Sequence, residues 1–319
     1  VIVIVMTGLA FGLRLINLGR SDLTFDEAAT VLIARKPLAE MIPYLLHAFH
    51  EHPPGYYILA AGWMQLAGDS ESMLRFLSVI AGTLSIPVLY RWVKEAIDPL
   101  AGIVAALLLS VTPVHIFYSQ NARMYTLVGL LALLSWWLVL RLTRDDRRHY
   151  WLGLMVCGIV GLLTHYYMGL VLAAEAVYLL VTWGQNKRLL GKWLIWLGTP
   201  IALGAIYILA APGALSTIRR MFQGGLGTRL TLGGLRSLAA DMIFGPHGNL
   251  GIEVWSVILV MVMIGLGLAL LGRAGVRRTI GLMLACTVLV PLASVAALPE
   301  ALSVRYVLFL IFPIDVALT

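Results

Sequence analysis

The chain has 319 residues, of which 60% are hydrophobic and only 12% are charged. Soluble domains are about 25% charged, so this composition excludes an ordinary soluble protein and indicates a polytopic α-helical membrane protein. The net charge of +7 does not point to a nucleic-acid partner, because the arginines and lysines fall mostly in short loops between apolar runs, as cytoplasmic anchors do.

Apolar runs long enough to cross a bilayer recur along the whole chain and predict an all-α polytopic fold with about ten spans. We interpret residues 1–319 as one transmembrane module, and we expect it to be truncated at its C-terminus because the chain stops inside an apolar run. The expected spans are 1–18, 73–90, 100–118, 124–142, 150–164, 167–183, 193–211, 254–271, 280–298 and 304–318.

Basic residues gather in every second loop, at 141–148, 187–192 and 273–278, and Arg91 and Lys94 fit the same alternation. The positive-inside rule places these loops in the cytoplasm. The other loops then face outward and hold nearly all the unusual polar residues. We therefore expect a multi-pass protein of the inner (plasma) membrane with its site on the extracytoplasmic face.

Residues 19–72 form the first outer loop. Within it, residues 37–50 have apolar side chains at helical spacing, which predicts an interfacial helix. Residues 55–66 are apolar but shorter than a span requires, so we expect a juxtamembrane helix there. The second outer loop, 212–252, is rich in glycine and holds no phosphate-cradling glycine motif, which favours a mobile lid or a lipid-facing loop.

Asp26 and Glu27 are adjacent acids soon after the first expected span. Hydrocarbon penalises ionised carboxylates, so acids at its edge serve chemistry, ion coupling or structural pairing. We interpret Asp26 as a general base, with Glu27 orienting it, binding the acceptor or pairing with an arginine. The alternative is that the two acids only cap the helix that begins near Ala28, through the helix dipole.

Arg75 and Arg123 lie where expected spans meet the outer face. A guanidinium binds phosphate through paired hydrogen bonds, so both are candidate phosphate ligands. The alternative for each is a snorkelling side chain or a structural ion pair. His52 and His165 are candidate hydrogen-bond partners of phosphate or sugar, with a satisfied interfacial histidine as the alternative.

Four tyrosines accompany these residues, and together they are candidates to stack on a sugar or line a lipid path: Tyr56, Tyr57, Tyr125 and Tyr166. Tyrosine belts at membrane interfaces also occur without any ligand. The cluster of His47, His50, Glu51 and His52 matches no standard metal-ligand spacing, so we expect no metal or other cofactor to be required.

Glu175 lies near the middle of an expected span, and an intramembrane carboxylate supports a different function, a proton-coupled transporter or a lipid flippase. The same carboxyl group is also compatible with a neutral side chain that is hydrogen-bonded between helices. No paired halves with matching broken helices accompany it, which favours an enzyme over a transporter.

Short motifs follow one another on the predicted outer side: Asp26-Glu27, His52 to Tyr57, Arg75 to Ser78, Ser119 to Tyr125, Thr164 to Tyr167, and Arg305-Tyr306. In order and spacing they resemble the GT-C glycosyltransferases of the protein-mannosyltransferase and aminoarabinose-transferase superfamily, over essentially the whole chain. The resemblance implies a GT-C-type bundle of about 10 to 11 transmembrane helices with juxtamembrane helices in the first outer loop.

The resemblance also implies an enzyme that takes a monosaccharide from a polyprenyl phosphate and passes it to a lipid, a glycan or a protein. In the family an acid of the first outer loop is the base, which falls on Asp26 here. The family's proline-rich motif often carries Lys or Leu where this chain has Pro54-Gly55, so an arginine takes the place of the phosphate-binding lysine of some relatives. Arg305 joins the substrate-binding set.

The residues fit this chemistry independently of the resemblance. A lipid-linked sugar already has a phosphate leaving group, so the protein has to deprotonate an acceptor hydroxyl and stabilise the departing phosphate. One base and one or two fixed cations are enough for both tasks.

Overall fold

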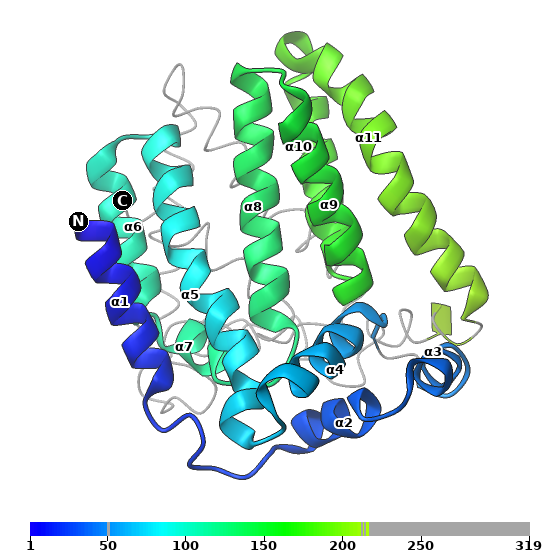
Figure 1. Ribbon diagram of the computed structural model, residues 1–319. Helices are drawn as coiled ribbons and strands as arrows, with labels where there is room; N and C mark the ends of the chain where they lie inside the picture. The colour runs from blue at the N-terminus through cyan, green and yellow to red at the C-terminus, as the bar shows by residue number, and fades with distance from the viewer. Residues whose placement is uncertain (50–51, 212, 214, 217–319) are drawn as a thin grey trace, which may run out of the picture.

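The computed structural model describes residues 1–49, 52–211, 213 and 215–216, with the side chains of 183–186 excepted. Every regular element in these residues is an α-helix (Figure 1). The helices are α1 (Ile2–Leu15), α2 (Phe25–Ala34), α3 (Leu38–His47), α4 (Gly55–Ala67), α5 (Glu71–Ala96), α6 (Pro99–Val111), α7 (Pro113–Ser119), α8 (Tyr125–Arg144), α9 (Arg148–Thr164), α10 (Met168–Val181) and α11 (Trp183–Ala210).

The helices α1, α5, α6, α8, α9, α10 and α11 run roughly side by side as a bundle (Figure 1). Within the described residues, three are long and apolar enough to cross a membrane: Glu71–Ala96, Tyr125–Arg144 and Lys187–Ala210. The helices α1, α9 and α10 are apolar but shorter. This confirms the all-α membrane fold. The expected spans 254–271, 280–298 and 304–318 and most of the second outer loop, 212–252, lie outside the described residues.

The expected span 100–118 is bent by 59° between α6 and α7. Pro113 has no N–H, and its ring clashes with the carbonyl group four residues earlier, so it ends α6 and begins α7. The expected span therefore consists of two helices joined by a bend that the sequence analysis did not predict. The first helix is also shorter than expected, because Ile16 is extended and Asn17 has a left-handed φ of 58°.

The helices α2, α3 and α4 lie across one end of the bundle (Figure 1). Helix α4 has 13 residues and crosses this end instead of running along the bundle, as expected for residues 55–66. Helix α3 corresponds to the expected interfacial helix. A small core of Ile33, Met41, Leu45 and Tyr57 joins the three helices.

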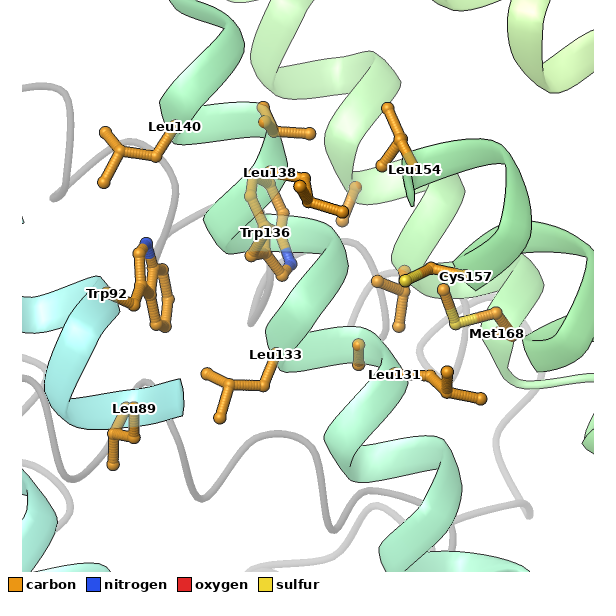
Figure 2. Packing of buried hydrophobic residues seen from close by; sticks show 14 of the residues in the cluster. Leu89, Trp92, Leu131, Leu133, Trp136, Leu138, Leu140, Leu154, Cys157 and Met168 are labelled. Atoms are coloured by element: carbon orange, nitrogen blue, oxygen red, sulfur yellow. The ribbon is translucent and has the colours of Figure 1, made fainter. Parts of the chain in front are cut away.

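The main core is built around α8 (Figure 2). Trp136 of α8 meets Tyr178 of α10 edge to face, with ring centroids 5.9 Å apart. The side chains drawn in Figure 2 come from α5 (Leu89, Trp92), α8 (Leu131, Leu133, Trp136, Leu138, Leu140), α9 (Leu154, Cys157) and α10 (Met168). Large apolar side chains thus hold these four helices together. Most of the polar side chains discussed here lie at the two ends of the bundle.

Glu175 is the exception, because its side chain is fully buried inside the bundle. Its carboxylate oxygens accept hydrogen bonds from the Ser135 hydroxyl group of α8 and from Nε1 of Trp193 of α11, the latter at 3.3 Å. The structure therefore favours an acid that is hydrogen-bonded between helices over an open transport site.

The end of the bundle opposite α2 to α4 carries the loops that are expected to be cytoplasmic. Glu95 pairs there with Arg91 at 2.7 Å and with Arg141 at 3.2 Å, and Asp146 contacts Lys192. The basic loops and the candidate site residues described below thus gather at opposite ends, as the alternation of charge predicts.

Candidate active site

Asp26 and Glu27 lie in the first turn of α2, where the local sequence fixes their positions. Thr24 is the N-cap, its Oγ1 accepts the Glu27 N–H at 3.4 Å, and the Glu27 carboxylate accepts the Thr24 N–H at 2.9 Å. This reciprocal capping box turns Glu27 back toward the helix start.

Glu27 forms a buried ion pair with Arg75. Nε and Nη2 of Arg75 donate to its two carboxylate oxygens at 2.9 and 3.1 Å, and Glu27 is 1% exposed. The Ala122 N–H adds a hydrogen bond of 2.8 Å. Burial acts to raise the pKa of the Glu27 carboxyl, but the hydrogen bonds from Arg75, Ala122 and Thr24 outweigh it and lower that pKa below its ordinary value.

Arg75 uses all of its hydrogen-bond donors inside the protein. Besides the two bonds to Glu27, Nη1 donates to the carbonyl oxygens of Leu18 and Ser21, and Nη2 donates to that of Asp22. A guanidinium has five N–H groups, and these contacts occupy all five. The geometry therefore favours the structural ion pair over phosphate binding for Arg75.

Arg123 connects the candidate base to the proline-rich motif. Its Nη1 donates to the Asp26 carbonyl oxygen at 3.2 Å and to Thr30 Oγ1 at 3.0 Å, and its Nη2 lies 2.9 Å from Nε2 of His52. The guanidinium also lies over the ring of Tyr125, 5.8 Å from its centroid. Nε of Arg123 is buried and has no hydrogen-bond partner among the described residues.

His165 extends this cluster. Its ring centroid lies 5.0 Å from that of His52 and 6.5 Å from that of Tyr125, and its Nδ1 accepts the Tyr167 N–H at 3.1 Å. Burial, and then the charge of Arg123, lower the pKa of His165 to about 3. His165 is therefore a neutral imidazole near neutral pH.

Gly55 lies where the proline-rich motif approaches the end of α9. A Cβ atom at position 55 would lie 2.6 Å from the carbonyl oxygen of Leu163, which no real side chain tolerates. The start of α4 can therefore approach the end of α9 closely. This contact brings His52 and His165 together.

The tyrosines are not an exposed belt. Tyr56 and Tyr57 are 1% and 0% exposed, and Tyr125 is buried beside Arg123. Tyr166 is half-buried, and its ring centroid lies 6.5 Å from that of Tyr207. Tyr125 has a ring contact with His165, whereas Tyr57 belongs to the core between α2, α3 and α4.

Asp26 is half-buried, in contrast to Glu27. It is therefore the acid of the pair that a substrate can approach. The structure brings Asp26, His52, Arg123, Tyr125 and His165 into one cluster, which we call the Arg123 cluster. Glu27 and Arg75 lie directly behind it, joined through Ala122. Arg305 and Glu51 lie outside the described residues.

A cavity of about 420 Å³ lies between α2 and α4, lined by residues such as Ala34, Lys36 and Met64. None of the predicted site residues lines it. In the part of the chain that the structure describes, no group of three or more His, Cys, Asp or Glu side chains is arranged to hold a metal ion. The expectation that no metal is required stays a prediction.

Sequence reasoning missed Thr24, Thr30 and the Ala122 N–H. The spacing of Thr24 and Glu27 is a recognisable capping-box signal and could have been used. No sequence signal marks Thr30 or a single backbone N–H as a partner for residues about a hundred positions away.

The comparisons with known proteins agree with this fold. The sequence model described as dolichyl-phosphate-mannose-protein mannosyltransferase matches residues 51–210, half of the chain. A search of curated proteins gave no significant match.

Among solved structures, the chain is similar to ArnT from Cupriavidus metallidurans bound to undecaprenyl phosphate, with a TM-score of 0.70 and 16% identity over 99% of this chain. It is also similar to the Archaeoglobus fulgidus oligosaccharyltransferase, with a TM-score of 0.59 and 14% identity over 100% of this chain. It spans 59% of the length of the former and 48% of the latter. These matches confirm the GT-C fold, and the chain belongs to the dolichyl-phosphate-mannose-protein mannosyltransferase family.

Proposed function

We propose that the protein is an integral-membrane glycosyltransferase that moves a monosaccharide from a polyprenyl-phosphate donor to an acceptor hydroxyl of a lipid, a glycan or a protein. Membership of the mannosyltransferase family supports glycosyl transfer. ArnT was solved with undecaprenyl phosphate bound, and the oligosaccharyltransferase was solved tethered to an acceptor peptide. Those ligands support a polyprenyl-phosphate donor and a separate acceptor here.

One observation carries the assignment of roles: the guanidinium of Arg123 contacts both the Asp26 backbone and His52. A candidate base and a candidate phosphate ligand are thereby held at one point. All five N–H groups of Arg75 have acceptors, whereas Nε of Arg123 has no hydrogen-bond partner among the described residues, so Arg123 retains a donor for a ligand. We therefore assign phosphate binding to Arg123, with His52 beside it.

In the proposed reaction, the Asp26 carboxylate takes the proton of the acceptor hydroxyl group. The acceptor oxygen forms a bond to the anomeric carbon of the sugar, and the bond from that carbon to the phosphate oxygen breaks. The leaving polyprenyl phosphate keeps the electron pair, and the positive charge of Arg123 stabilises the extra negative charge. Tyr125 lies beside Arg123, and His165 lies beside Tyr125.

Glu27 and Arg75 support this arrangement without touching substrate. Their ion pair fixes the first turn of α2 against residues 18–22 and against Ala122, the neighbour of Arg123. Asp26 and Arg123 are thus positioned by a rigid, buried scaffold, which is what precise proton transfer requires.

The proposed site faces the extracytoplasmic side of the inner membrane. The supporting observation is the basic end of the bundle, where Arg141 of α8 and Lys192 of α11 belong to basic clusters that the positive-inside rule assigns to the cytoplasm. The Arg123 cluster lies at the other end.

The function is tested with the full-length protein in proteoliposomes supplied with a panel of radiolabelled polyprenyl-phosphate sugars and extracted acceptor lipids, glycans and proteins. We expect label to pass from one donor to a new product. Movement of the labelled lipid across the bilayer without any new product would instead support a flippase and overturn the proposal.

A further inference from the structure

Arg14 is a fully buried cation in α1 that the proposed reaction does not use. All five of its N–H groups have acceptors. Nε donates to Ser119 Oγ at 3.1 Å, and Nη1 donates to the Ala10 carbonyl oxygen at 2.8 Å. The remaining three reach the broken helix pair α6 and α7: the carbonyl oxygens of Ser110 and Leu109, both at 3.3 Å, and Nδ1 of His115 at 2.7 Å.

Two of these acceptors exist because the helix is broken. In a continuous helix, the Leu109 carbonyl oxygen would accept the N–H of residue 113, but that residue is Pro113, which has none. The Ser110 carbonyl oxygen loses its helical partner at the same bend. Arg14 supplies the missing donors. Its charge is favoured there, because the C-terminal end of α6 carries a partial negative charge.

No carboxylate forms an ion pair with Arg14 in the described part of the chain. Its charge is therefore balanced by carbonyl dipoles and by one histidine nitrogen. Removing a buried charge with this many partners leaves several acceptors unsatisfied. The Arg14 contacts thus fix the angle between α6 and α7.

This angle determines where Arg123 lies. Helix α7 ends at Ser119, and only three residues separate Ser119 from Arg123, which lies just before α8. Gln120 ties the segment to α1 a second time, because its Nε2 donates to the carbonyl oxygens of Arg14 at 3.1 Å and Ile16 at 2.7 Å. Ala122 then binds Glu27.

We propose that Arg14 is a positioning residue that holds α7 and the 120–124 segment so that Arg123 meets Asp26 and His52. The inference rests on the proposed function of the Arg123 cluster. A positioning role differs from a general packing role in one respect: the effect of an Arg14 substitution on activity should depend on the presence of the Arg123 side chain.

Gly82 of α5 provides an independent way to disturb the same contact. A Cβ atom at position 82 would lie 2.1 Å from Ser119 Oγ and 3.2 Å from Nε of Arg14. Gly82→Ala therefore pushes directly on the Arg14–Ser119 contact without removing any charge. Gly12→Ala is the matched control, because a Cβ atom at Gly12 has nothing within 4 Å in the described structure.

The experiment measures kcat and KM of the purified full-length protein with the donor that the wild type uses best. Arg14→Met should lower kcat/KM at least tenfold per folded molecule. Arg14→Lys should retain an intermediate activity, because one ammonium group keeps the charge but has only three donors for five acceptors. Gly82→Ala should also lose activity, and Gly12→Ala should match the wild type.

A double-mutant cycle identifies the route of the effect. On an Arg123→Ala background, Arg14→Met should change kcat/KM less than threefold, because the group that it positions is already absent. A full tenfold loss on both backgrounds would overturn the proposal, as would wild-type kcat/KM in Arg14→Met. If Arg14→Met does not fold, Arg14→Lys enters the same cycle.

Hydrogen exchange separates this proposal from the proposed function. In Arg14→Met and Gly82→Ala, the amides of 120–124 should exchange at least tenfold faster, while those of α8 should keep the wild-type rate. If the wild type shows no transfer activity but the two variants show this exchange pattern, the glycosyltransferase assignment is rejected and the structural role of Arg14 at 120–124 is retained. Unchanged exchange at 120–124 would reject the positioning role.

Discussion

Glu27 and Arg75, which are 48 positions apart in the sequence, share two hydrogen bonds of 2.9 and 3.1 Å and are 1% and 3% exposed. This buried ion pair divides the adjacent acids Asp26 and Glu27 into two roles. Glu27 belongs to the buried scaffold, and Asp26 is the half-buried acid to which we assign the role of base.

We expect Asp26→Asn to abolish transfer while the protein stays folded and binds donor. The amide keeps the size of the side chain but cannot accept the proton, and a well-placed general base contributes roughly 10²–10⁴ in rate. Initial rates and donor binding are measured on the same preparation, with the exposed Glu40→Gln of α3 as control. Turnover of Asp26→Asn within a few-fold of wild type would remove Asp26 from the mechanism.

Glu27→Gln should mainly reduce stability. Breaking a buried ion pair by changing one partner costs about 3–5 kcal/mol, because the remaining charge is left uncompensated. The exposed pair of Arg35 and Asp69 is the matched control, since exposed pairs contribute about 0–1 kcal/mol. The melting temperature should therefore fall much further in Glu27→Gln than in Asp69→Asn. Equal melting temperatures would contradict the scaffold role.

The lowered pKa of Glu27 predicts an acid-side loss of stability. Its contribution is fully present above the ordinary carboxyl pKa of 4.5 and is lost as the pH falls through the lower folded-state pKa. The wild-type melting temperature should fall steeply below pH 4.5. Glu27→Gln should be less stable at neutral pH and should show a shallower fall in that range. The same steepness in both proteins would disprove the linkage to Glu27.

His165 should affect stability in a different pH window. Its pKa is about 3 in the folded protein and 6.5 ordinarily, so the unfolded chain binds the proton first and stability decreases as the pH falls from 6.5 toward 3. In His165→Gln, the melting temperature should depend less on pH between pH 6.5 and 4.5. This interval lies above the pH range in which Glu27 contributes to the loss of stability. An unchanged slope in that interval would mean that folding does not lower the pKa of His165.

Arg123 and Arg75 should respond differently to substitution. Arg123→Ala should lower transfer by about 10- to 100-fold, the equivalent of a charge-assisted hydrogen bond of about 1.5–3 kcal/mol. The same proportional loss is expected for donors that differ only in the sugar, because the phosphate is common to all of them. Arg75→Lys should instead lower the melting temperature. A loss with Arg123→Ala that varies from sugar to sugar would assign Arg123 to sugar recognition.

The sequence allowed the helical fold, the juxtamembrane helices and the gathering of the unusual polar residues at one end of the bundle to be predicted, because hydropathy and charge are local signals. It did not distinguish Arg75 from Arg123. Both are arginines at span ends, and what separates them is the number of internal acceptors, which come from Glu27 and residues 18–22. Such long-range partners leave no local trace.

Arg14 was overlooked for a related reason. A single arginine inside an apolar run suggests only an imperfect span, and its acceptors Leu109 and Ser110 are 95 and 96 positions away. Pro113 did mark a break within the expected span 100–118, but the sequence did not say which group would satisfy the carbonyl oxygens that the break releases.

The Arg14 contacts also set an order for biogenesis. Helix α1 leaves the ribosome before α6 and α7, so at first its arginine has none of their acceptors. A charged side chain near a helix end can extend to the lipid headgroups in the meantime. Arg14 lies one residue from the end of α1 and is well placed to do this. The first helix therefore reaches its final depth only when α6 and α7 arrive and draw Arg14 into the protein.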